Sequence, residues 1–100
     1  MSQIAAALLS GSVAWAAPDD TTDPARARVA AQCAAFWEGA GDSARAAPFR
    51  DIATAAGASR AETERRIARM RPAMARLTAD RAESERARDL WARHAALCGG

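Results

Sequence analysis

The sequence predicts an all-α fold, a small bundle of three to four helices stapled by one disulfide. Alanine, which has the highest helix propensity, is very abundant, whereas tyrosine is absent and phenylalanine occurs 2 times. β-Branched residues are also few, so a sheet would lack the side chains that usually build it. Apolar residues recur at helical spacing, and the 2 cysteines can form one covalent staple.

Residues 1–16 are predicted to be a signal peptide. They carry no charged side chain, and their apolar stretch has the length of a signal-peptide core, about 7–15 residues, which is too short to span a bilayer. Small side chains at Ala14 and Ala16 favour cleavage before Ala17, so we expect a periplasmic or secreted protein. Residues 1–3 include no basic side chain; either the free amino group supplies the positive charge or the true start codon lies upstream. The alternative interpretation is a buried N-terminal helix of a cytosolic protein.

No stable membrane anchor is expected. The sequence from Leu9 to Ser12 resembles a lipoprotein acylation site, but Ser12 stands where the lipid-bearing cysteine would have to be. Residues 17–22 are polar and aperiodic and are predicted to be a disordered tail before one helical domain over 23–98. Because a domain below about 80 residues gains little stability from its core alone, small exported domains usually add a staple.

The first helix is predicted over 24–38. Asp23 is a suitable N-cap, and Pro24 fits the first helical position, where its missing N–H costs nothing. Gly39 and Gly41 are expected to end the helix. Its inward stripe is predicted to contain Val29, Cys33, Phe36 and Trp37.

The second helix is expected to start at a cap provided by Asp42 or Ser43. Pro48 complicates it, because residues 42–47 can form a short turn of helix and Pro48 can open a separate segment. Its inner face is predicted to contain Phe49, Ile52, Ala53 and Ala56.

The third helix begins with a capping box, Ser59 followed by Glu62. Pro72 is expected to kink this helix or to divide it near Arg71. Its inner face is predicted to contain Thr63, Ile67, Met70, Met74 and Leu77.

The fourth helix is predicted to begin within residues 78–82, with Thr78 or Asp80 as its cap, and to run to about Cys98. If the helices alternate in direction, a Cys33–Cys98 disulfide ties its last turn to the middle of the first helix. Closing so long a loop stabilises the folded state by about 4 kcal/mol on the chain-entropy model. The inner face is predicted to contain Ala87, Leu90, Trp91, His94, Leu97 and Cys98.

Charge and residue types restrict the function. The formal net charge of +2 is too small to indicate nucleic-acid binding. The chain has 1 histidine, no lysine, no tyrosine and no catalytic or haem-attachment motif, so we expect neither an enzyme nor a cofactor. The predicted function is protein–protein interaction in the periplasm, as an accessory subunit, an inhibitor or an assembly or chaperone factor, with an unknown protein partner.

An arginine-rich segment over 60–76 supplies the candidate interaction face, Arg65, Arg66 and Arg69. Such a face suits an acidic protein or another anionic surface. The competing interpretation is a solvated face whose arginines pair with acidic residues elsewhere in the chain.

The alternative function is binding of a small ligand or copper in the region of Met70, Met74 and His94. Thioethers suit Cu(I), and His94 lies one helical turn from Cys98. Against this, methionines at helical spacing are ordinary core residues, and an oxidised Cys98 cannot bind a metal. We therefore predict no metal site and keep these residues as the alternative.

Overall fold

The computed structural model describes residues 22–99, which form four α-helices and no strand. The helices are α2 (Pro24–Gly39), α3 (Ser43–Ala55), α4 (Arg60–Asp80) and α5 (Glu85–Leu97). The predicted all-α class and the predicted disulfide Cys33–Cys98 are confirmed. The predicted signal peptide over 1–16 and residues 17–21 of the predicted tail lie outside the described residues. Within residues 22–99, no helix has the length and apolar character needed to cross a bilayer.

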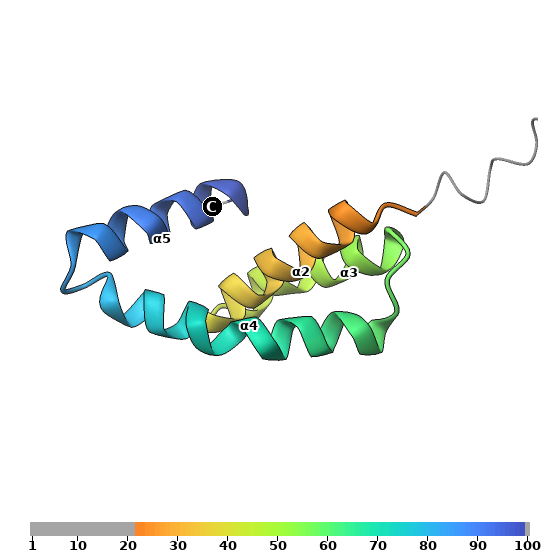
Figure 1. Cartoon of the computed structure of the whole chain (residues 1–100), viewed down its shortest axis with the longest axis horizontal. Coiled ribbons are helices and arrows are strands. Elements are labelled where there is room, and N and C mark those ends of the chain that lie inside the picture. The colour runs from red at the N-terminus through yellow and green to blue at the C-terminus, as the bar shows by residue number, and fades with distance from the viewer. Residues whose placement is uncertain (1–21, 100) are drawn as a thin grey trace, which may run out of the picture.

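The chain reverses direction at each loop, so α2 and α4 run one way and α3 and α5 run the other (Figure 1). The central element is α2, which packs along both α3 and α4. The longest helix is α4: α2 and α3 lie along its first part, and α5 lies along its second part (Figure 1). The predicted antiparallel arrangement of the first and last helices is therefore observed.

Three of the predicted helix starts are confirmed in detail. Asp23, Asp42 and Ser59 cap α2, α3 and α4, each accepting a hydrogen bond at 3.0–3.1 Å from the backbone N–H three residues later. Each bond satisfies one of the N–H groups that a helix start leaves without a partner. The reciprocal half of the capping box is not formed, because the Glu62 carboxylate accepts a hydrogen bond from Arg66 at 2.7 Å instead.

The start of α5 differs from the prediction. The cap is Ser84, whose hydroxyl accepts a hydrogen bond at 3.2 Å from the backbone N–H of Ala87. Thr78 and Asp80, the predicted caps, belong to the end of α4. The Thr78 hydroxyl donates to the Met74 carbonyl at 2.9 Å, so this side chain bonds inside its own helix rather than opening a new one.

Both internal prolines are tolerated at exposed positions. Pro48 lies inside one continuous α3, so the expected short turn over 42–47 with a separate segment is not found. Pro72 lies inside an undivided α4, so the alternative of two separate helices near Arg71 is wrong. The ribbon of α4 bends near its middle, as expected where proline removes a backbone hydrogen bond (Figure 1).

The core is built largely from small side chains on α2. Phe36 is fully buried, and Trp37 is 3% exposed. The small residues around them let the neighbouring helices approach closely. The remaining buried residues of α2 are Ala27, Ala30, Ala31, Cys33, Ala34 and Ala35.

Two helices, α2 and α4, cross closely at Gly39. A Cβ placed on this residue would lie 2.7 Å from the Met74 Cβ and 2.7 Å from the Ala75 backbone nitrogen. The sequence suggested only that Gly39 ends the helix. In the structure it is the last residue of α2, and its missing side chain allows α4 to pass against the backbone.

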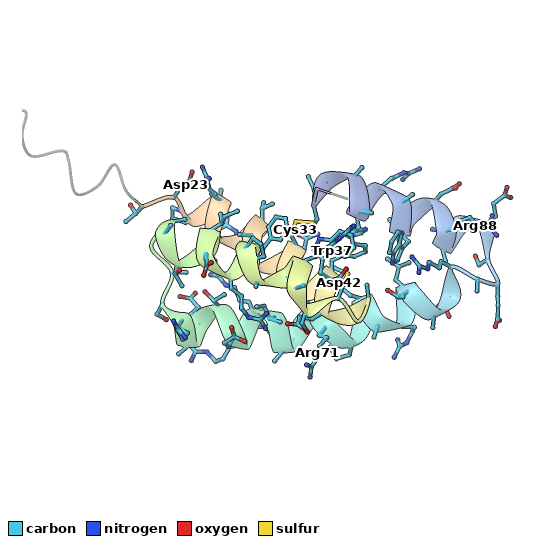
Figure 2. The ribbon with its side chains drawn as sticks, turned by 180° about the vertical axis from the view of Figure 1, so that it is seen from behind. Asp23, Cys33, Trp37, Asp42, Arg71 and Arg88 are labelled. Carbon is cyan, nitrogen blue, oxygen red and sulfur yellow. A yellow bond between two sulfur atoms is a disulfide. The ribbon has the colours of Figure 1, made fainter. Side chains whose placement is uncertain are left out.

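The last helix is attached through few side chains. The Cys33–Cys98 disulfide joins it to α2, and the Trp37 indole N–H donates to the Cys98 carbonyl at 3.1 Å in a buried hydrogen bond. Figure 2 shows the side chains of Cys33 and Trp37 reaching from α2 toward the end of α5. Trp91, half-buried, packs 5.1 Å from Phe36 between ring centroids, and its indole N–H donates to the Thr78 hydroxyl at 3.1 Å.

Three residues predicted to face inward are instead exposed. Val29 is 47%, Leu90 41% and Leu97 61% exposed. The stripe by which α5 touches the rest of the fold is narrow, and no residue inside the helix is buried. Leu90 and Leu97 each lie one position before a contacting residue, Trp91 or Cys98, and so fall beside the stripe.

We expect Gly39→Ala to destabilise the fold although alanine is the better helix former. Adding a methyl group at this crossing forces the backbones of α2 and α4 apart, at a cost of about 2–3 kcal/mol. Gly41→Ala is the comparison, because its Cβ would meet nothing within 4 Å and only the left-handed backbone (φ 81°) would cost about 1 kcal/mol. Urea denaturation of the two variants measures the difference. A Gly39→Ala protein as stable as the parent would contradict the close crossing.

Candidate functional site

The candidate site is an open hollow between α2 and α4, with a volume of about 380 Å³. Each helix contributes three residues, spaced so that they share one helical face. The lining residues are Arg28, Val29 and Gln32 from α2 and Arg66, Arg69 and Met70 from α4. We call this set the α2–α4 hollow.

Part of the α2–α4 hollow is apolar. Val29 is 47% exposed and lines the hollow, one helical turn before Cys33, where α5 is attached. Met70 is half-buried and packs against the hydrophobic core while also lining the hollow. An apolar ligand group placed here would contact both side chains and remove Val29 from water.

The rest of the lining is strongly basic. Arg66 is partly fixed, since its guanidinium donates to Glu62 at 2.7 Å. Arg28 and Arg69 are exposed and make no ion pair within residues 22–99. No acidic side chain lines the hollow, so its three guanidinium groups favour a negatively charged ligand.

The structure brings together two of the three arginines predicted as an interaction face. Arg66 and Arg69 line the α2–α4 hollow, whereas Arg65 is exposed on α4 outside it. Sequence reasoning missed the contribution of α2, because Val29 was expected in the core. Arg28 and Gln32, on either side of Val29 on the same helical face, are the polar neighbours that could have indicated an exposed position.

The residues of the alternative copper site have other roles in the fold. Met74 packs against the hydrophobic core beside Gly39. The His94 ring stacks on Phe36 with centroids 5.5 Å apart, and its Nδ1 lies 3.0 Å from the Leu90 carbonyl oxygen. Among the described residues, no group of three or more histidine, cysteine, aspartate or glutamate side chains is placed to hold a metal ion.

A second charged cluster joins three helices. Arg50 on α3 binds Glu38 of α2 at 2.6 Å and Glu64 of α4 at 2.7 Å. All its guanidinium nitrogens are engaged, with Nε and NH2 bonded to Glu64 and NH1 to Glu38. The small hollow beside Arg50 is also lined by Arg60, Asp51 and Glu64, which mix both signs of charge. Hydrogen bonds from Arg50 and Ser43 hold the pKa of the Glu38 carboxyl below its ordinary value of 4.5. This cluster therefore positions helices rather than binding a ligand.

The Glu38–Arg50 pair predicts how stability depends on pH. Because the folded state lowers the pKa of Glu38, the pair contributes its full stability above the ordinary pKa of 4.5 and loses it as pH falls through the lowered value. Between about pH 5 and pH 3, the free energy of unfolding should decrease more steeply in the parent than in Glu38→Gln. Glu83→Gln, which removes an exposed carboxylate, is the matched control and should keep the parent slope. Equal slopes for the parent and Glu38→Gln would contradict the role of the pair.

Comparison with known proteins gives no relative. No family model, no curated protein and no solved structure matches this chain.

Proposed function

We propose that this chain is an exported, non-catalytic interaction module that binds a protein partner through the α2–α4 hollow. The observation that supports the proposal most strongly is that the apolar side chain of Val29 is exposed in a hollow that three arginines also line. Arginine and methionine, both present in the α2–α4 hollow, are enriched at protein interfaces, and arginine is among the residues whose loss costs the most binding energy. The partner relationship can be that of an accessory subunit, an inhibitor or an assembly factor.

The periplasm is the compartment that we propose. The disulfide joins Cys33 and Cys98, which are 1% and 2% exposed, and such bonds form and persist in oxidising compartments. The signal peptide predicted over 1–16 is the second support, and it rests on the sequence alone.

Other surfaces support binding less well. The outer face of α5 exposes Leu90, but the neighbouring Glu85, Arg86, Asp89 and Arg93 mix both signs of charge. The hollow beside Arg50 contains a cation already bound by two carboxylates. Only the α2–α4 hollow, among these three, combines an exposed apolar group with unpaired charge of one sign.

Site-specific photocrosslinking tests this function. A benzophenone amino acid replacing Gln32, which lines the hollow, should give a discrete adduct in periplasmic extract. The same group replacing Ala44, an exposed residue of α3, is the control and should not give that adduct. Adding Arg28→Glu and Arg69→Glu should abolish the adduct at position 32, because these substitutions reverse the charges of the two arginines of the hollow that form no ion pair.

Two results would contradict the proposed function. One is the absence of any adduct at position 32 in extract and in intact cells. The other is the same adducts at positions 32 and 44, unaffected by the two charge reversals, which would show contact without a specific site.

A further inference from the structure

The last helix already shows how a helix packs against α2 and α4 together. Trp91 contacts Phe36 of α2, with ring centroids 5.1 Å apart, and donates a hydrogen bond to Thr78 of α4 at 3.1 Å. Seven residues later, Cys98 is bonded to Cys33 of α2. Because Trp91 touches both helices and Cys98 is bonded to α2, the second half of α5 packs along the seam between α2 and α4, which we call the groove.

The α2–α4 hollow is the continuation of this groove. From Cys33, the next turn toward the start of α2 carries Val29. On α4, Met74 lies at the crossing with α2, and Met70 lies one turn closer to the start of the helix. Since α2 and α4 run in the same direction and α5 runs against them, both turns lie beyond the end of α5 (Figure 1). Thus α5 occupies one part of the groove and the hollow is the neighbouring part.

We propose that the occupant of the α2–α4 hollow is an acidic amphipathic helix of the partner protein, laid in line with α5. This inference rests on the proposed function, and it adds the chemistry of the partner. An apolar side chain of that helix would cover Val29 and Met70, while carboxylates on its flanks would reach Arg28 and Arg69.

The charges select this occupant. Three arginines and no acidic residue line the hollow. Two of them, Arg28 and Arg69, form no ion pair with a carboxylate within residues 22–99. A basic or neutral helix would leave these guanidinium groups facing a partner that offers no counter-charge.

A peptide titration tests the chemistry. The probe is a dye-labelled amphipathic peptide of about 15 residues, long enough to form a helix, with leucines on one face and glutamates on both flanks. Fluorescence anisotropy should show binding to the parent protein that weakens at least about tenfold in Arg28→Gln/Arg69→Gln. The matched variant Arg86→Gln/Arg93→Gln removes two exposed arginines from α5 and should bind like the parent. The same peptide with glutamine in place of glutamate should bind weakly to all three proteins.

Several outcomes would overturn the inference. They are no binding of the acidic peptide, equal binding by the two arginine variants, or equal binding of the glutamine peptide. Arginine-dependent binding to vesicles containing phosphatidylserine, without binding of the peptide, would assign the hollow to a lipid surface instead. Self-association lost in Arg28→Gln/Arg69→Gln would assign it to a second copy of the chain. If the peptide fails while the photocrosslink at position 32 succeeds, the interaction function stands and only the partner chemistry is wrong.

Discussion

The bonds made by Cys98 determine how the last helix lies against α2 and α4. A disulfide to Cys33 and a buried hydrogen bond from Trp37 both end at this residue. Because no residue inside α5 is buried, packing alone holds this helix only weakly in one position. The covalent bond removes that freedom, and Trp91 is then held where it can contact both α2 and α4.

The same constraint leaves the α2–α4 hollow open. With its last turn held at Cys33, α5 lies beside Phe36 and Trp37 and ends before it reaches Val29. The part of the groove near the starts of α2 and α4 therefore keeps an exposed apolar side chain among arginines.

The features that local physical chemistry controls were predictable from the sequence. Asp23, Asp42 and Ser59 were expected as caps because their side chains satisfy backbone N–H groups within the same turn, and the cysteine pairing followed from there being two.

Burial was less predictable, because it depends on which helices meet. Val29 and Leu97 both fit the helical spacing of core residues, but both are exposed. Val29 is exposed because α5 ends before reaching it, and Leu97 is exposed because it points away from the contact face of α5. Two further features, the tight crossing at Gly39 and the shared hollow lined by Arg28 and Arg69, depend on how α2 and α4 are placed relative to each other. The spacing of residues within one helix gives no information on that placement.

Hydrogen–deuterium exchange of the parent and a Cys33→Ala/Cys98→Ala variant tests directly whether the bond at Cys98 holds α5 in its groove. Amides of α5 should exchange about 100-fold faster in the variant, whereas those of α2, α3 and α4 should remain protected. Unchanged protection of α5 would show instead that packing alone holds this helix. Loss of protection in all four helices together would show that α5 is not a separately attached element.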